Sequence, residues 1–511
     1  MLLRAGAPAS VLGAACGQLR CLSTGAQSVT GEMITYAREN FKGAHDQALD
    51  IVKSGLSYMT TGPEAGRLYL AQAEVEADRS RWPEVADLAR LAATAASEAA
   101  PTTHEENVLV GQVELFASCV ATRAHLVKAR SAEAFSSAQT CMEVARKSFS
   151  HKDQEEQRWQ GLVLASSTVG LVQHAASDFD VAAESFEDAL SRADQPPSTP
   201  PADGSTSLAP AGAAAAPSTP AGTSTADGQS ASPIATTAPA EAAAGGPGSS
   251  PSNGRSGDGL SSVGGGQQQQ QSKDHLIAPA LKQAALFMLA QANSVAKAEP
   301  EPLQRALQLA ARAVAGAERA VDEVKSGAGV FQSPVFCGEA LVDAHLTDAQ
   351  LSMHTEDWDA AEAKLTKALA AAEGISSDSH PRVALVLMLL GFAYSRSARV
   401  TLAEGLFREC SKMLQLTPTR AEDIELTMVH PSIGALLSWR YCQLLTALPN
   451  RGTEAAAWHK MAGCLWEEAP IGRKNAPETV FGGLEYLKGK GDPGMGVVVD
   501  LMARRALPRQ L

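Results

Sequence analysis

The sequence predicts an all-α protein in which pairs of helices repeat along the chain. Alanine is abundant and only 5% of the 511 residues are aromatic, which favours helices over strands. Apolar residues recur with helical spacing over most of the chain. Residues 349–368 also share their pattern with residues 391–410, 42 positions later. Such a period is typical of stacked helix pairs.

Helices are expected wherever apolar residues recur every three or four positions. Before residue 195 these segments are 31–56, 65–79, 82–99, 104–130, 131–148, 154–175 and 179–193. After residue 272 they are 275–297, 302–325, 335–355, 358–373, 381–397, 401–415, 424–447, 453–467, 476–488 and 494–506. The last segments depart from the repeat, as terminal repeats of helical arrays commonly do, and are expected to form a helical cap.

Two segments lack this periodicity. Residues 1–30 contain two arginines and no acidic residue, a composition typical of organelle presequences. Residues 195–272 are mostly Pro, Ala, Ser, Thr, Gly and Gln, with too few bulky side chains to offset the entropy lost on ordering. The predicted organisation is a presequence (1–30), an N-terminal helical domain (31–194), a disordered linker (195–272), a C-terminal helical domain (273–470) and the helical cap (471–511).

One set of positions recurs in the helix pairs. The sets are Ala349, Ala361, Leu365 and Ala368; Gly391, Ala403, Phe407 and Cys410; and, before the linker, Gly170, Ala182, Phe186 and Ala189. A weaker copy occupies 65–92. Small residues allow two helices to cross closely, and larger ones such as Tyr394 and Phe407 fill the space beside the crossing. Both halves are therefore expected to contain the same unit.

This pattern of Gly or Ala, Tyr, Ala, Phe and Ala resembles the tetratricopeptide repeat (TPR). The 42-residue period and the His380-Pro381 start of one copy are similar to the longer repeats of kinesin light chains. The resemblance implies an antiparallel helix-pair solenoid, wound as a right-handed superhelix and interrupted here by the linker. It also implies a concave groove that binds protein partners.

The groove positions indicate which kind of partner to expect. Chaperone-binding members of the TPR family place Lys and Asn there to hold a carboxylate, and this chain lacks that clamp. The candidate protein-binding groove residues are Asp343, Leu346, Gln350, Leu385, Met388 and Phe392. Their largely apolar character favours a helix or an extended apolar segment of a partner. The alternative is that Met388 and Phe392 pack against another helix of the same chain.

Composition argues against several functional classes. The formal net charge is −13 and no basic stripe is visible, so nucleic acid is not an expected partner. No apolar stretch approaches the ~20 residues needed to span a bilayer. The eight cysteines show no Cys-x-x-Cys spacing, which favours a reducing compartment and a role for free cysteines as small apolar residues.

No catalytic motif is visible in the sequence. There is no phosphate-binding Gly-rich loop and no Gly-x-Ser-x-Gly elbow, so neither an enzyme nor a cofactor is expected. His345, Asp348, His354 and Glu356 lie near one helix end, where a solvated face is expected rather than a metal site.

These observations favour a non-enzymatic scaffold for protein–protein interaction in the mitochondrion, in the matrix, acting in assembly or maintenance of a multi-protein complex. A plastid or cytoplasmic location is the alternative. The alternative functions are a cytosolic adaptor like the kinesin light chains and an organellar RNA-binding helical-repeat protein. The sequence leaves the identity of the protein partner and the oligomeric state open.

Overall fold

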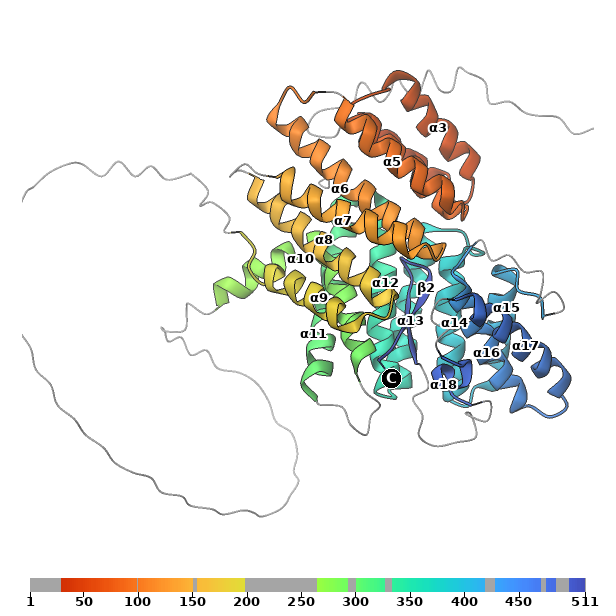
Figure 1. Ribbon diagram of the computed structural model, residues 1–511. Coiled ribbons are helices and arrows are strands. Elements are labelled where there is room, and N and C mark those ends of the chain that lie inside the picture. The colour runs from red at the N-terminus through yellow and green to blue at the C-terminus, as the bar shows by residue number, and fades with distance from the viewer. Residues whose placement is uncertain are drawn as a thin grey trace, which may run out of the picture. The chain divides into compact units, whose positions relative to one another are not determined.

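A computed structural model describes the chain over residues 29–98, 100–149, 154–197, 264–292, 300–326, 333–418, 428–469, 475–483 and 496–510 (Figure 1). The helices before the low-complexity segment are α2 (Val29–Asn40), α3 (His45–Tyr58), α4 (Pro63–Asp78), α5 (Trp82–Glu98), α6 (His104–Val127), α7 (Ser131–Lys147), α8 (Glu155–Ala175) and α9 (Phe179–Ala193). Those after it are α10 (Gly264–Gln291), α11 (Pro300–Lys325), α12 (Pro334–His354), α13 (Trp358–Ile375), α14 (Pro381–Arg396), α15 (Val400–Met413), α16 (Pro431–Thr446), α17 (Gly452–Glu468) and α18 (Pro477–Phe481). Two strands follow, β1 (Val497–Asp500) and β2 (Arg505–Pro508).

Helices that are neighbours in the sequence pack against each other, as in α4 and α5, α8 and α9, α12 and α13, α14 and α15, and α16 and α17 (Figure 1). The predicted all-α fold of paired helices is confirmed over the described residues. Residues 1–28 of the predicted presequence and 198–263 of the predicted linker lie outside them, and Val29 and Thr30 belong to α2.

One turn joins the two helices of several pairs. The first helix ends with a left-handed residue of φ 56–66° at Ser80, Ala129, Ser177, Glu356 and Ala398. The next N–H then donates to a carbonyl five residues back, at 2.9–3.0 Å, as Arg399 does to Tyr394. This is the Schellman arrangement, which satisfies carbonyl groups at a helix end. The same turn recurs in both halves of the chain.

The crossing of paired helices is formed by a glycine and an aromatic ring. A Cβ atom on Gly391 of α14 would lie 3.0 Å from Phe407 Cε1 of α15, and one on Gly170 of α8 would lie 3.0 Å from Phe186 Cε2 of α9. Ala349, Ala361, Leu365, Ala368, Ala182, Ala189, Ala403 and Cys410 are all buried. Tyr394 is partly buried, and its hydroxyl donates to Glu362 Oε1 at 2.9 Å.

Several helix boundaries differ from the expected ones, and two of the differences have a clear physical reason. The segment 31–56 forms two helices rather than one, because the chain turns at Gly43, whose φ is +78°. Helix α10 begins at Gly264 and therefore includes the run Gln267–Gln271, which the sequence pattern assigned to the linker. Glutamine is a good helix former and can extend a helix that is anchored further along the chain.

The predicted helical cap over 471–511 is wrong in its last part. Residues 494–506 were expected to be helical, but β1 and β2 form an antiparallel hairpin with Val497 opposite Pro508 and Asp500 opposite Arg505. The short run Val497–Val499 is buried throughout and rich in β-branched side chains. Periodicity alone does not separate such a buried strand from a helix. We refer to residues 496–510 as the C-terminal hairpin.

The C-terminal hairpin lies between the two largest apolar clusters. Val497, Val499 and Ala506 belong to a cluster formed mainly by α12–α18. Val498 and Leu507 belong to a cluster that joins α6–α9 with α10–α12. Because successive strand residues point to opposite faces, each face of the hairpin packs against a different cluster. The hairpin therefore connects the two helical halves.

Candidate functional site

We refer to α8, α10, α12 and α16, which bond the C-terminal hairpin, as the inner helices. Two of them, α12 and α16, bind the main chain of its two strands. On β1, Gln350 of α12 donates to the Val499 carbonyl at 2.9 Å and accepts from the Val499 N–H at 2.7 Å. On β2, Ser432 of α16 accepts from the Ala506 N–H at 3.0 Å and donates to its carbonyl at 3.4 Å. These bonds cover both outer edges of the hairpin, which would otherwise leave buried main-chain groups unpaired.

The turn and the end of the hairpin are fixed in the same way. Asp343 Oδ1 accepts from the Leu501 N–H at 3.1 Å. The His174 ring bonds the Pro508 carbonyl through Nε2 at 2.8 Å, so Nε2 carries the proton. The Gln510 N–H donates to the Ala290 carbonyl at 2.9 Å. The Gly496 N–H donates to the Val480 carbonyl of α18 at 2.8 Å, so five helices contact the main chain of a segment of fifteen residues (496–510).

A buried cation and two carboxylates join α10, α12 and β1. Lys282 pairs with Asp500 at 3.0 Å and also with Asp343, and none of the three side chains is more than 2% exposed. Gln283 donates to Asp500 as well. Burial raises the pKa of Asp343 to about 6 against the effect of Lys282. Burial also opposes ionisation of Asp500, but Lys282 and the Ala503 N–H outweigh it and lower its pKa.

Arg504 of the hairpin turn and Arg505 of β2 contact the ends of helices in the N-terminal half of the chain. Arg505 donates to the carbonyls of Leu126 at 3.4 Å and Ala175 at 3.3 Å, at the last turns of α6 and α8. A helix C-terminus carries partial negative charge and favours a cation there. Arg504 donates to Ser80 Oγ at 3.2 Å and lies 4.8 Å from the Trp82 ring centroid. Burial lowers the pKa to about 9 for Arg504 and about 10 for Arg505.

A second buried ionic cluster lies close to Arg504. Glu339 of α12 accepts from Arg123 of α6 at 2.5 and 2.6 Å and from Arg382 of α14 at 2.8 Å. Arg382 also pairs with Asp78 of α4 at 2.7 Å. Burial opposes the charge on Glu339, but the two arginines lower its pKa to about 2. The cluster holds the N-terminal helices against α12 and α14 while the nearby guanidinium groups lower the pKa of Arg504.

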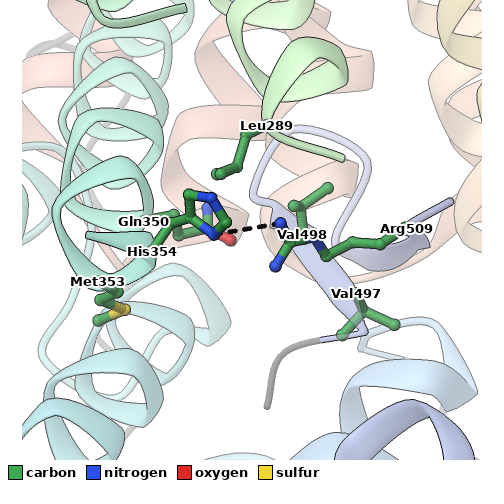
Figure 2. A pocket seen from close by; sticks show the side chains of 7 residues that line it. All are labelled: Leu289, Gln350, Met353, His354, Val497, Val498 and Arg509. Carbon is green, nitrogen blue, oxygen red and sulfur yellow. Dashed lines mark hydrogen bonds between the residues drawn. The ribbon is translucent and has the colours of Figure 1, made fainter. Parts of the chain in front are cut away.

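A small hollow lies beside β1 (Figure 2). Gln350, Met353 and His354 from α12 face Val497, Val498 and Arg509 of the C-terminal hairpin across it. Arg509 Nη2 lies 3.2 Å from His354 Nδ1. Burial and the neighbouring guanidinium lower the pKa of His354 to about 4, so its ring is neutral and accepts this bond near neutral pH. The hollow therefore belongs to the same contact between α12 and the hairpin.

The structure places the predicted groove residues inside the molecule. Asp343 and Gln350 bind the hairpin, whereas Leu346, Leu385, Met388 and Phe392 are at most 2% exposed and pack in the core. Phe392 lies between the Trp358 ring, 6.1 Å away, and the Arg440 guanidinium, 4.5 Å away. All six residues contact the chain itself, and binding of a separate partner at these positions stays a prediction.

Several residues of this site were missed by sequence reasoning, namely His174, Lys282, Gln283, Ser432, Asp500, Arg504 and Arg505. One part of the site, strand β1, does have a recognisable sequence pattern. Three consecutive valines followed by Asp500 and a turn are typical of a buried strand. No local pattern indicates which distant helix supplies the partners of such a strand.

The described residues show no group of three or more His, Cys, Asp and Glu side chains able to hold a metal ion. None of the helices within the described ranges is long and apolar enough to cross a membrane.

These features define a helical-repeat protein whose inner helices enclose its own C-terminal hairpin. No protein-family model matches the chain, and no curated protein sequence matches it. Among solved structures, BtubC (BKLC) from P. vanneervenii is 14% identical, with 66% of this chain and 89% of that chain covered and a TM-score of 0.30. A chain of the Naa15/Naa10 complex bound to HypK-THB is 10% identical, with 94% and 82% covered and a TM-score of 0.16. Both TM-scores are low, so the fold assignment rests on the helices of this chain.

Proposed function

We propose that this chain is a non-enzymatic scaffold for protein–protein interaction. One observation carries the proposal: side chains of the inner helices bind the N–H and C=O groups of an extended segment, at Gln350 with Val499 and at Ser432 with Ala506. Main-chain bonds of this kind give affinity for a polypeptide whatever its side chains. Helical arrays commonly use their inner surface for such binding.

We further propose a mitochondrial location, in the matrix, and a role in assembly or maintenance of a multi-protein complex. The arginine-containing, acid-free composition of residues 1–30 supports import into an organelle. The partner is a protein, and the residues of this chain that contact it include the groove candidates. Because Asp343 and Gln350 are covered by the C-terminal hairpin, a partner would reach them only in place of the hairpin.

Cross-linking mass spectrometry in intact mitochondria tests this function. The epitope tag belongs in the low-complexity segment, because Gln510 at the C-terminus bonds Ala290 and a tag there would disturb the hairpin. We expect the tagged chain in the matrix fraction, with cross-links to the same small set of proteins in independent preparations. Recovery of the chain in the cytosol, or the absence of any reproducible cross-linked protein, would contradict the proposal.

The same experiment locates the partner on the scaffold. If a partner replaces the hairpin, cross-links from α12 or α10 to the partner are expected, together with fewer cross-links between residues 496–510 and α10. If cross-links fall only on helices other than the inner ones, the groove assignment is wrong, but the chain would still be a protein-binding scaffold. Cross-links to RNA after ultraviolet irradiation would instead support the organellar RNA-binding alternative.

A further inference from the structure

Two cysteines lie within reach of each other on neighbouring helices. Cys119 is in the middle of α6, Cys141 is in α7, and their Sγ atoms are 3.5 Å apart. Both are free thiols. A disulfide has an S–S distance of about 2.05 Å, so closing the bond requires a shift of about 1.5 Å shared between two side chains.

The two thiols have different access to solvent. Cys119 is partly exposed and lines a cavity that is partly open to solvent. The cavity lies between α6, α8 and α10 and is bounded by Phe116, Leu171, Phe336 and Met502. Cys141 is buried and is absent from the cavity wall. A reagent that enters this cavity therefore meets Cys119 first.

Their hydrogen bonds also distinguish the two thiols. Cys119 Sγ lies 3.5 Å from the Cys141 thiol and 3.7 Å from the hydroxyl of Thr168, which donates its own proton to the Leu164 carbonyl. The bond with Cys141 lowers the pKa of Cys119. The same bond, together with burial, raises the pKa of Cys141 well above its usual value. A thiolate is the reactive form, so Cys119 is suited to attack and Cys141 to a second step.

We propose that Cys119 and Cys141 are a modification site, a dithiol that small-molecule disulfides such as oxidised glutathione convert into an intramolecular disulfide. In the first step the Cys119 thiolate attacks one sulfur of the reagent, a mixed disulfide forms at Cys119, and one glutathione thiolate leaves. In the second, Cys141 loses its proton to solvent and attacks Cys119 Sγ. The mixed disulfide breaks and a second glutathione leaves. Two electrons pass from the protein to the reagent.

The proposal goes beyond the scaffold function, because it concerns α6 and α7 rather than the hairpin edges. The cavity does connect the two regions, since Met502 and Ala503 of the hairpin turn form part of its wall. Disulfide formation would move Cys119 Sγ toward Cys141 of α7. Oxidation would therefore change the part of the cavity wall that Cys119 forms.

The test is oxidation of the folded full-length protein with oxidised glutathione, followed by alkylation and peptide mapping. We expect a Cys119–Cys141 disulfide in the wild type. In Cys141→Ala we expect a stable glutathione adduct on Cys119, because the second step is lost. In Cys119→Ala we expect Cys141 to stay unmodified because it is buried. Mapping assigns the products of Cys16 and Cys21 separately.

Cys464 provides the matched control, because it is also a partly exposed helical cysteine. We expect Cys119 to be modified before Cys464, because the Cys141 thiol 3.5 Å away lowers the pKa of Cys119 and so favours its reactive thiolate. Two outcomes would overturn the proposal. One is a Cys119 that stays reduced while Cys464 reacts. The other is a glutathione adduct on Cys119 that persists in the wild type without giving the Cys119–Cys141 disulfide.

Discussion

The helix crossing of α14 and α15 and the C-terminal hairpin are both buried, but different forces hold them. At the crossing, Gly391, Ala403 and Phe407 make apolar contacts between neighbours in the sequence. The hairpin is held by ions and main-chain hydrogen bonds to helices far away in the sequence, including Lys282 and Gln350. One fold thus combines a local, repeated contact with a single long-range one.

This difference has an energetic consequence. Loss of apolar contact costs free energy in proportion to the cavity that remains. Loss of one member of a buried ion group leaves its partners charged without compensation, which costs several kcal/mol from one substitution. A single change at either contact is therefore expected to cost several kcal/mol, for a different reason in each.

Lys282→Met is expected to have an effect as large as any single change at the crossing. This change leaves Asp343 and Asp500 buried together without their cation. We expect a loss of about 3–5 kcal/mol in the free energy of unfolding, measured by chemical denaturation at pH 7. Lys147→Met is the control, because its pair with Glu143 is exposed and should contribute under about 1 kcal/mol. Equal, small effects of both substitutions would show that the buried cluster does not stabilise the hairpin.

Phe407→Ala tests the crossing itself. The ring is fully buried against Gly391, so its removal leaves a cavity and should cost about 3–5 kcal/mol. Phe186→Ala removes the equivalent ring between α8 and α9 and should cost a similar amount. Phe135→Ala is the control at a ring that is 40% exposed. Unequal costs for Phe407 and Phe186 would argue against one shared unit.

Gly391→Leu should destabilise less, by about 1–3 kcal/mol, because the added side chain overpacks the crossing. Gly405→Ala in the same pair provides a control of opposite sign. A Cβ atom on Gly405 meets nothing within 4 Å, and α15 should gain about 0.5–1 kcal/mol from the better helix former. If both substitutions stabilise, Gly391 is not at a close crossing.

The smallest effect concerns the pH dependence of His174. Burial lowers its pKa to about 4, below the unfolded value of 6.5. The unfolded chain therefore takes up a proton first, and stability is fully present above pH 6.5 and falls as the pH drops toward 4. His174→Gln keeps a donor for Pro508 but does not titrate. From pH 7 to pH 5 we expect the wild type to lose about 1–2 kcal/mol more than the variant.

Other groups titrate in the same range, including Asp343, whose pKa is raised to about 6. The folded chain therefore takes up this proton first, and Asp343 adds stability as the pH falls, opposite to His174. These other groups are present in both proteins and largely cancel in the comparison. Parallel stability curves for His174→Gln and the wild type would show that His174 titrates alike in the folded and unfolded chains.

Local features of the fold could be predicted from the sequence because they depend on neighbours. The spacing of Gly391, Ala403 and Phe407 reports one helix pair, and apolar periodicity reports most of the helices. The repeated Schellman turns were not visible in this way. Ser80, Ala129, Ser177, Glu356 and Ala398 are not glycine, so no residue type marks their left-handed conformation.

The candidate site could be predicted only in part. Asp343 and Gln350 were identified because the helix-pair register places them on the inner face. The hairpin that binds them was not predicted, because the contacts between Gln350 and Val499 and between Lys282 and Asp500 span 149 and 218 residues. Such pairings depend on the folded arrangement, which a single sequence does not specify locally.

In this structure the inner helices enclose the C-terminal hairpin as a part of the folded core. Hydrogen exchange of the intact chain, followed by mass spectrometry, tests it most directly. We predict that peptides covering 496–510 are protected as strongly as those of α12, since Gln350 and Ser432 bond the amides of Val499 and Ala506. Rapid exchange over 496–510 while α12 and α16 stay protected would contradict the claim.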